Sequence, residues 1–202
     1  MNAALGLCNV EAGSSSEYLD RLMRRNCFAA LWPLFAKATR PAKELTESYS
    51  ALVHLRPFIR AGEPCRVVHV GDGAHARTAA MFSLKTKTHN ISVDPELNLG
   101  LVDGWCEQFG IRRMERRKAR IQDVAAELNA LPDMRTLVTF VHAHVGVERV
   151  LSELHWDVAF TLACCVPGKQ LSRTNVEREG EDPNVLSSGR RYQVLVNPAR
   201  SA

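Results

Sequence analysis

Two glycines and an acidic residue 23 positions beyond the first of them have the types and spacing of a ligand site. Gly71-Asp72-Gly73 follows the apolar run 66–70 and precedes a helix-forming run at 76–84. Glycine accepts a positive φ and lets a ligand approach the backbone, and the unpaired N–H groups of a helix starting here would face the turn. Asp94 ends a second strand-like run, 89–93. An acid about 20 residues past a glycine turn is where a βαβ unit holds ribose hydroxyls, so the spacing predicts a nucleoside cofactor.

The glycine pattern alone leaves the identity of the nucleoside open. Gly71, Gly73 and Ala76 satisfy a permitted variant of the G-x-G-x-x-G fingerprint of dinucleotide sites, so NAD is one candidate. However, the unit begins only at residue 66, behind a long helical region, and no Tyr-x-x-x-Lys pattern supports a nicotinamide-dependent oxidoreductase. A Gly-x-Gly turn by itself is also common between any strand and helix, and it is Asp94 that favours a cofactor site.

Histidines and cysteines end two later strand-like runs and could carry the reaction. His142 and His144 end a predicted strand at 136–145, and Cys164-Cys165 lies in another at 156–166. Residues two apart on a strand share a face, and a histidine facing a crevice can act as a general base for a hydroxyl or an amine. The same residues could hold a metal, but adjacent cysteines point to opposite faces and a fourth ligand is missing, so we predict no metal site.

Two further polar residues follow predicted strands. Asp123 comes just after a predicted third strand at 116–121, where an acidic side chain also suits the N-cap of a helix at 124–131. Lys169, four residues past Cys165, is expected near the crevice, where it could polarise a hydroxyl or bind a phosphate.

The glycine turn resembles motif I of class I S-adenosylmethionine-dependent methyltransferases, acidic-x-Gly-x-Gly-x-Gly. In this sequence His69 stands at the acidic position and His75 at the third glycine. The similarity to the class extends over about residues 41–170 and implies a Rossmann-like fold with S-adenosyl-L-methionine as the cofactor. It implies a ribose contact at Asp94, an adenine contact at Asp123, and a cofactor site made of His69, Gly71, Asp72, Gly73, Asp94 and Asp123.

A shorter resemblance concerns the methyl acceptor. His142-Ala143 and Cys164-Cys165 are similar to the strand ends of a group of tRNA 2′-O-methyltransferases and their relatives, although His144 and Val145 depart from the His-Ala-Cys-Gly of that group. This resemblance implies RNA as a substrate. Neither a Lys-Asp-Lys-Glu tetrad nor an Asn-Pro-Pro-Tyr motif is evident. We therefore expect His142 and Lys169 to be the catalytic residues of a divergent site.

The elements that must position these residues alternate along the chain. A flexible lead-in, 1–16, precedes an N-terminal helical segment, 17–62, in which Pro33 is expected to interrupt the first helix and a second helix spans 41–59. From 63 to 202 the strand-like runs alternate with helical ones, including 95–110 and 146–154. This order predicts a single α/β, doubly wound, mostly parallel Rossmann-like methyltransferase sheet, with the first strand between the second and fourth.

The last part of the chain is expected to be incomplete. Residues 172–189 are polar and predicted to form a loop, and 191–196 is predicted to be a final edge strand. One such strand is fewer than the closing hairpin of a methyltransferase sheet.

Composition places the chain among ordinary globular proteins. Of 202 residues, 46% are hydrophobic and 24% charged. No apolar run approaches the roughly 20 residues of a membrane span, and residues 1–16 lack a basic region, so neither a membrane segment nor a signal peptide is expected. Six cysteines without C-x-x-C spacing indicate reduced thiols and a cytoplasmic location.

The formal net charge of +4 is unevenly distributed. Residues 112–120 hold six bases, and smaller basic clusters lie at 21–25 and 190–191. Such a run suits either a solvated surface or phosphate contacts with RNA. Three hypotheses follow: a methyltransferase acting on RNA; a catalytically degenerate methyltransferase fold that serves as a binding or assembly subunit, with a protein partner or a second copy of the chain; and an NAD(P)-binding oxidoreductase.

Overall fold

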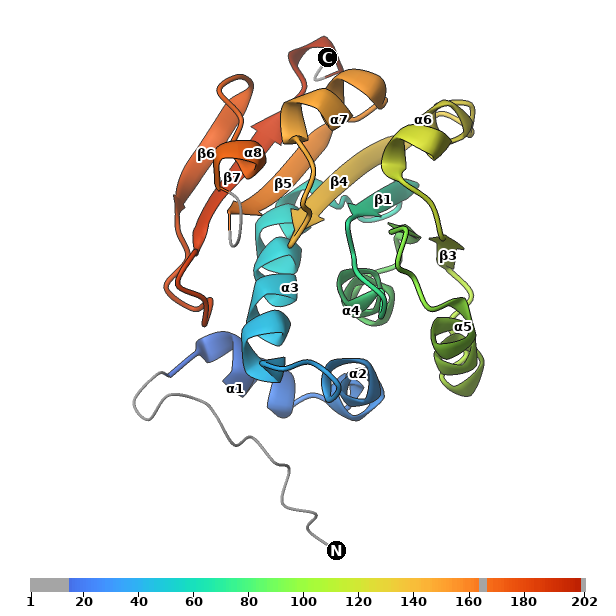
Figure 1. Ribbon diagram of the computed structural model, residues 1–202, viewed down its shortest axis with the longest axis vertical. Helices are drawn as coiled ribbons and strands as arrows, with labels where there is room; N and C mark the ends of the chain where they lie inside the picture. Colours follow the sequence, from blue (N-terminus) through green and yellow to red (C-terminus); the bar gives the residue numbers. More distant parts are fainter. Residues whose placement is uncertain (1–14, 164–166, 201–202) are drawn as a thin grey trace, which may run out of the picture.

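Seven strands form one mixed sheet in the order β3-β2-β1-β4-β5-β7-β6 (Figure 1). The computed structural model describes residues 15–163 and 167–200. The parallel strands are β1 (Cys65–Val70), β2 (His89–Val93), β3 (Met114–Arg117), β4 (Arg135–Val141) and β5 (Val158–Ala163). Two antiparallel strands follow, β6 (Val176–Glu181) and β7 (Arg191–Val196). The predicted fold class is confirmed, and β1 lies between β2 and β4 as expected.

Helices cover both faces of the sheet. On one face lie α3 (Pro41–Leu55), α4 (Arg77–Lys85) and α5 (Leu99–Gln108); on the other lie α6 (Ile121–Asn129) and α7 (Val147–Glu153). Each helix follows from apolar side chains at helical spacing that reach the β-branched residues of the strands. Short helices α8 (Pro167–Gln170), η1 (Arg56–Phe58) and η2 (Pro198–Arg200) complete the described chain. No helix in the described ranges combines the length and apolarity needed to cross a membrane.

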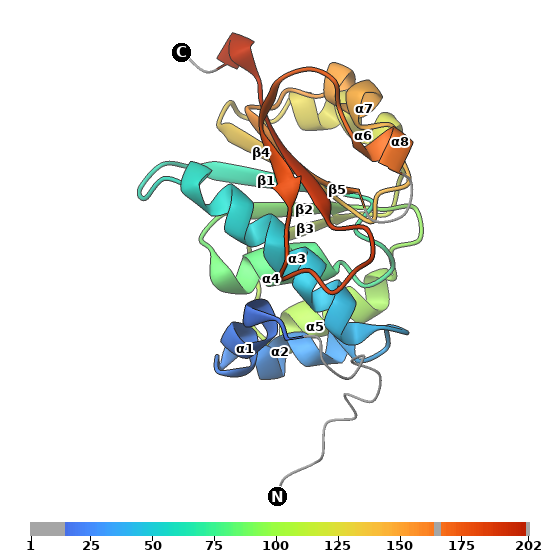
Figure 2. The ribbon, with the colours of Figure 1, turned by 90° about the vertical axis from the view of Figure 1, so that its left-hand side faces the viewer.

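The N-terminal helical segment shares its core with the sheet. Helices α1 (Glu17–Met23) and α2 (Cys27–Phe35) lie on the outer side of α3 and α4 (Figure 2), and their apolar side chains join the core on that face. The expected break at Pro33 is wrong: Pro33 lies inside α2, and the break falls at 24–26, where the chain has no apolar side chain to bury. Most of the expected flexible lead-in lies outside the described residues, but Ser16 is buried and its hydroxyl donates to the Asn184 carbonyl at 2.6 Å.

Two predicted boundaries differ from the structure, and a third lies outside the described residues. The third strand ends at Arg117 rather than at residue 121, because Ile121 is buried as the first residue of α6. The fourth ends at Val141 rather than at 145, so the histidines lie in the loop that follows it. The described part of the fifth strand ends at Ala163, and Cys164 and Cys165 lie outside the described residues.

The C-terminal part of the sheet also differs from the prediction. Residues 172–189 contain a strand, β6, and β7 lies between β5 and β6 instead of at the edge. The closing antiparallel pair is therefore present, and the prediction of a missing strand is wrong. Every residue of β6 except Gly180 is exposed, and charges on an edge strand are a common protection against unwanted pairing. Because of this polarity, the sequence of the segment resembles that of a loop.

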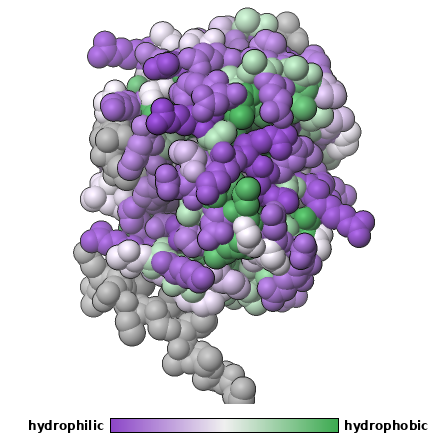
Figure 3. Space-filling model, turned by 45° about the vertical axis from the view of Figure 1, so that its right-hand side comes forward, coloured by the Kyte–Doolittle hydropathy of each residue, from purple (hydrophilic) through white to green (hydrophobic). Residues whose placement is uncertain are grey.

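Side chains on the surface are mostly hydrophilic. Figure 3 shows one face of the molecule, on which hydrophobic side chains gather only in small groups between purple, hydrophilic ones. Few large hydrophobic residues of the described chain are strongly exposed, namely Met23, Leu99 and Val176.

Candidate cofactor and active site

A cavity of about 550 Å³ opens at the carboxyl ends of the parallel strands. Its walls come from the turn after β1, the ends of β2 and β4, the start of α6 and one side of α3. This is the edge at which doubly wound sheets bind their ligands, beside the point where the strand order reverses between β1 and β4. The volume is in the range of sites that bind nucleoside-sized molecules.

The two glycines of the turn have different physical roles. Both line the cavity and both have positive φ, 67° at Gly71 and 70° at Gly73. A Cβ at Gly71 would lie 2.8 Å from Cα of Ala143, so this glycine is needed for the loop after β4 to approach the turn. A Cβ at Gly73 would meet nothing within 4 Å, so the backbone there is open to a ligand. Gly71 therefore allows the loop after β4 to pack against the turn, and Gly73 leaves the backbone accessible to a ligand.

Asp94 stands beside Gly73, as the spacing predicted. Its side chain accepts the Gly73 N–H at 2.9 Å on one oxygen and the Glu96 N–H at 2.7 Å on the other. It lines the cavity although its residue is only 8% exposed. Each carboxylate oxygen has a second lone pair, so Asp94 is held rigidly and can still accept hydroxyl donors from a ligand.

Asp72 occupies the place that an anionic ligand would take. Its carboxylate accepts the backbone N–H groups of Thr78 at 2.8 Å and Ala79 at 3.0 Å, in the first turn of α4, and the Ser92 hydroxyl at 3.0 Å. Burial raises the pKa of Asp72 to about 6, although these hydrogen bonds oppose the rise. The N–H groups that bind pyrophosphate in dinucleotide sites are therefore already used by the protein's own carboxylate.

His69 belongs to the core and not to the cavity lining. It is fully buried, and its ring contacts Thr139 Oγ1 at 2.9 Å and Asn90 Oδ1 at 3.2 Å. Burial lowers its pKa to about 3, so the ring is neutral at ordinary pH. The acidic position of motif I is thus taken by a neutral group whose hydrogen bonds connect β1 with its two neighbouring strands, β2 and β4.

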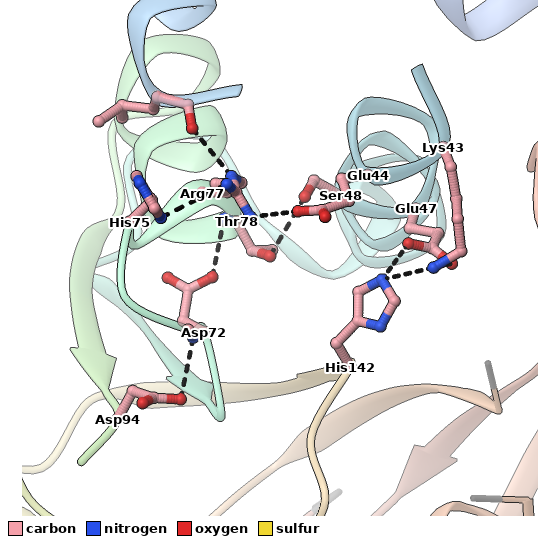
Figure 4. Close-up of polar contacts among 12 residues, drawn as sticks. Lys43, Glu44, Glu47, Ser48, Asp72, His75, Arg77, Thr78, Asp94 and His142 are labelled. Carbon is pink, nitrogen blue, oxygen red and sulfur yellow. Dashed lines mark hydrogen bonds and ion pairs between the residues drawn. The ribbon is translucent and has the colours of Figure 1, made fainter. Parts of the chain in front are cut away.

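A charged pair missed by the sequence analysis closes one end of the cavity. Arg77, in α4, forms an ion pair with Glu44, in α3, and both side chains line the cavity (Figure 4). The Arg77 guanidinium also donates to the Leu34 carbonyl at 2.9 Å, which fixes it against α2. His75, at the third glycine position, lies beside Arg77 but is not among the lining residues.

The predicted histidines both reach the cavity, and His142 does so in a distorted backbone conformation. His142 and His144 are lining residues, and His142 has φ 57°, which non-glycine residues adopt rarely. Such strain persists only where the surroundings impose it, and the next residue, Ala143, lies close to Gly71. Nε2 of His142 faces the carboxylate of Glu47, on α3, while Lys43 Nζ lies 3.1 Å from the same nitrogen (Figure 4).

Besides His69, two predicted site residues do not line the cavity. Asp123 is exposed on the first turn of α6, and the residues of that turn that reach the cavity are Ile121 and Gln122. Nor is Asp123 the N-cap of the helix, which is Arg120. Lys169 is exposed on α8; its neighbour Gln170 donates to the Ala143 carbonyl at 2.8 Å, which places α8 against the loop that carries His142.

The metal alternative is not tested by the structure. Among the residues described, no three His, Cys, Asp or Glu side chains are grouped as a metal site would require, and the cysteines of the His/His/Cys set lie outside them. Within the described chain, Cys27, Cys65 and Cys106 are free thiols.

Comparison with known proteins rests on solved structures. The chain matches no protein-family model, and no curated sequence is significantly similar to it. A mutant of MtNAS in complex with S-adenosylmethionine superposes with a TM-score of 0.52 over 90% of this chain and 75% of that one, at 13% identity. TrmK from M. capricolum, in complex with S-adenosylhomocysteine, gives a TM-score of 0.50 over 72% and 66% of the two chains, at 12% identity.

The chain has the class I methyltransferase fold. This confirms the family resemblance of the glycine turn at the level of the fold. The chain also matches the bifunctional kinase-methyltransferase WbdD at 22% identity, with 86% of this chain covered and a TM-score of 0.48, and it spans only 40% of that protein's length.

Proposed function

We propose that this protein is an S-adenosylmethionine-dependent methyltransferase. The observation that carries the proposal is the single cavity that brings Gly73, Asp94 and the cavity-lining part of α6 together at the ligand-binding edge of a methyltransferase sheet. S-adenosylmethionine supplies, when bound, a methyl group on a sulfonium sulfur. The residues of this chain would hold that molecule and prepare an acceptor for it.

The lining residues fit the three parts of the cofactor. Asp94 suits the ribose hydroxyls, because its carboxylate retains acceptor capacity beside the open backbone of Gly73. Ile121 and Gln122 suit the adenine, with one apolar and one amide side chain. The paired charges of Arg77 and Glu44 suit the carboxylate and ammonium of the methionine end. The adenine contact was expected at Asp123, but the residue of this turn that lines the cavity is its neighbour Gln122.

Asp72 favours this cofactor over NAD. A pyrophosphate bound at the start of α4 would have to displace a carboxylate that already accepts two backbone N–H groups and a hydroxyl. S-adenosylmethionine has no phosphate and makes no such demand. The Arg77–Glu44 pair has no net charge and likewise offers nothing to offset the two added negative charges of a pyrophosphate.

The cofactor assignment is tested with two ligands that share a ribose and an adenine. S-adenosylhomocysteine carries the amino-acid end, and 5′-methylthioadenosine lacks it. By titration calorimetry we expect Asp94→Ala to weaken both ligands by about 1.5–3 kcal/mol, because both lose a charge-assisted hydrogen bond. Arg77→Met should weaken only S-adenosylhomocysteine, with 5′-methylthioadenosine as the control that the variant's cavity is intact. Wild-type protein that binds NAD but neither of these ligands would refute the proposal.

For the acceptor we propose RNA, supported by the charge distribution. The basic run is divided by β3: Arg112 and Arg113 precede the strand and are exposed, while Lys118 and Arg120 follow it, and Arg120 lines the cavity. Bases at both ends of one strand would let a phosphate backbone extend along this edge of the sheet. His142 is the proposed proton acceptor, and the proposal keeps Lys169 as a phosphate contact beside its loop.

If the acceptor is RNA, removing basic side chains should lower the affinity for RNA by an amount that depends on the salt concentration. Replacing Arg112 and Arg113 with Ala should weaken RNA binding and lower the slope of log affinity against log salt by about one to two units, since each phosphate contact contributes roughly 0.7–0.9. Binding of S-adenosylhomocysteine should not change. Filter binding over a salt series measures the slope, and identical slopes for wild type and variant would return the run to an ordinary solvated surface.

A second candidate is a binding or assembly subunit that has lost catalysis. The observation that favours it is the location of His69. This residue stands at the acidic position of motif I, but its side chain is buried in the core and bonds to Thr139 instead of lining the cavity. Failure of wild-type protein to bind S-adenosylhomocysteine would favour this candidate.

A further inference from the structure

We propose that a second cavity of this protein binds one unpaired base of the RNA acceptor and selects bases that carry an exocyclic amine. The inference rests on the proposed function, because it takes RNA as the acceptor and adds a sequence preference. The second cavity, of about 320 Å³, lies between α7 and the segment that joins α8 to the C-terminal hairpin. Its volume is at the lower end of the range of small-molecule sites.

The lining of the second cavity combines an apolar floor with a polar rim. Leu151, Trp156 and Leu195 are buried and form the floor. Thr174 and Asn175 are exposed at the rim, and their side chains make no hydrogen bond within the described chain. A flat ring with apolar faces and a hydrogen-bonding edge matches such a lining. An unstacked base of single-stranded RNA is a ligand of this kind.

Glu148 determines which bases fit. Of the described residues that line the second cavity, Glu148 alone is charged. Its Oε1 accepts the Arg173 N–H at 2.8 Å and the Ser172 hydroxyl at 3.3 Å, whereas its Oε2 makes no hydrogen bond within the described chain. An ionised carboxylate can only accept hydrogen bonds. The amine of cytosine, adenine or guanine can donate to Oε2, whereas uracil has a carbonyl where cytosine has its amine.

Arg173 suits the phosphate attached to such a base. It lies between the lining residues Ser172 and Thr174, it is exposed, and its guanidinium forms no ion pair within the described chain. An acid inside the cavity and a cation beside it match a nucleotide, whose base is neutral and whose phosphate is anionic. A neutral sugar would not use the cation, and a free phosphate inside the cavity would be repelled by Glu148.

The walls of the second cavity are fixed by the protein's own hydrogen bonds. Ser172 donates its N–H to the Gln193 side chain at 2.8 Å, and the Gln193 amide donates to the Ser172 carbonyl at 3.2 Å. The Asn197 amide donates to the Trp156 carbonyl at 2.9 Å. Asn175 has φ 60°, which non-glycine residues adopt rarely. A site held in this way loses little conformational freedom when a ligand binds.

The second cavity adjoins the loop that carries the predicted histidines. Helix α7, which carries Glu148, begins directly after that loop, and His142 and His144 line the cofactor cavity. Gln170, at the end of α8, donates to the Ala143 carbonyl in the same loop at 2.8 Å, and α7 and α8 lie side by side in Figure 1 and Figure 2. A base held in the second cavity would therefore select which nearby nucleotide of the strand reaches the methyl group.

The test compares pentamers of cytidine and of uridine, whose bases match in size and differ in an amine against a carbonyl. By fluorescence anisotropy, wild type with S-adenosylhomocysteine should bind the cytidine pentamer about fivefold more tightly. Glu148→Gln should remove most of this preference, because an amide can accept from cytosine or donate to uracil and can still accept the Arg173 N–H. Glu177→Gln, on the exposed strand β6, makes the same change of charge and should keep the preference.

Two further measurements separate the parts of the site. Arg173→Gln should weaken both pentamers equally and lower the slope of log affinity against log salt by about 0.7, with the preference unchanged. The indole N–H of Trp156, assigned in ¹⁵N NMR spectra with Trp156→Phe, should shift with the cytidine pentamer. The same signal is followed with maltose, a neutral sugar.

The outcomes distinguish this inference from the proposed function. If wild type binds both pentamers equally, or if Glu148→Gln keeps the preference, the inference is overturned and RNA stands as the acceptor. A Trp156 signal that shifts with maltose and not with RNA would make this a sugar site and would also overturn it. If wild type binds S-adenosylhomocysteine but neither pentamer, the RNA acceptor and this inference fail together, and the methyltransferase proposal stands.

Discussion

Two buried carboxylates, one on α3 and one packed against it, are each paired with a histidine, and they differ in where their partners lie. Asp182, just after β6, accepts hydrogen bonds from Tyr18 at 2.7 Å and Ser50 at 2.6 Å, and its second oxygen accepts the Asn184 N–H at 3.0 Å. Glu47 contacts the cavity-lining His142 with one oxygen and lies 3.2 Å from the ammonium of Lys43 with the other.

The paired histidines differ in the same way. His54, 3.3 Å from Asp182, stacks on Tyr192, with ring centroids 3.9 Å apart, and also contacts the ring of Phe160, at 5.7 Å. Its side chain is 14% exposed and is not part of the cavity lining, whereas His142 lines the cavity. The cluster at Asp182 ties the C-terminal hairpin to α1 and α3, and the cluster at Glu47 includes a histidine that lines the cavity. A buried acid whose partners lie away from the cavity indicates a role in the fold, and one whose partner lines the cavity indicates a role in chemistry.

The largest effect is expected from the replacement of Asp182, which should lower the stability of the protein. Asp182→Asn should lower the free energy of unfolding by about 3 kcal/mol, because the hydroxyls of Tyr18 and Ser50 lose a charged acceptor inside the protein. Urea unfolding at neutral pH measures this change. Tyr18→Phe, which removes one donor and keeps the ring, should cost only about 1 kcal/mol, and equal losses in the two variants would contradict the assignment.

The same acid predicts a pH dependence of stability. Burial alone would raise the pKa of Asp182, but hydrogen bonds from three side chains hold it at about 2. Because the folded pKa lies below the unfolded value, the stabilisation is present above about pH 4 and is lost as the pH falls towards 2, by about 2 kcal/mol. Asp72 titrates in both proteins, so the difference between wild type and Asp182→Asn isolates Asp182. A pH-independent difference would contradict the prediction.

The smallest effect is expected on stability at Glu47. Glu47→Leu should change the free energy of unfolding by less than about 1 kcal/mol in either direction, because the partners of its carboxylate, His142 and Lys43, are partly exposed and can be solvated when the acid is removed. The same variant should lower methyl transfer, because the carboxylate contacts His142, the proposed proton acceptor. A loss as large as that of Asp182→Asn would show that both acids serve the fold, and the comparison would fail.

Much of the sheet could be predicted because its signals are local. The strand at 65–70 is marked by three valines, the strand at 89–93 by Ile91 and Val93, and glycine with a positive φ leaves a clear pattern at 71–73. Asp94 could be placed for the same reason, since a fixed spacing along one βαβ unit brings it to the turn. Prediction failed where polarity and burial disagree, as in the charged edge strand β6 and in α3, where Glu47 and Ser50 are buried beside Leu45.

The sequence by itself determined the fold class, the glycine turn and the acid beside it, Asp94, because periodicity and short-range spacing need no knowledge of distant residues. Only the tertiary structure decided the partners of each charge. Glu47 and His142 are 95 residues apart, and Asp182 and Ser50 are 132 apart. No local pattern connects residues at such separations. Packing brings them within hydrogen-bond distance, and it is the surrounding burial that makes one acid a support for the fold and the other a candidate for catalysis.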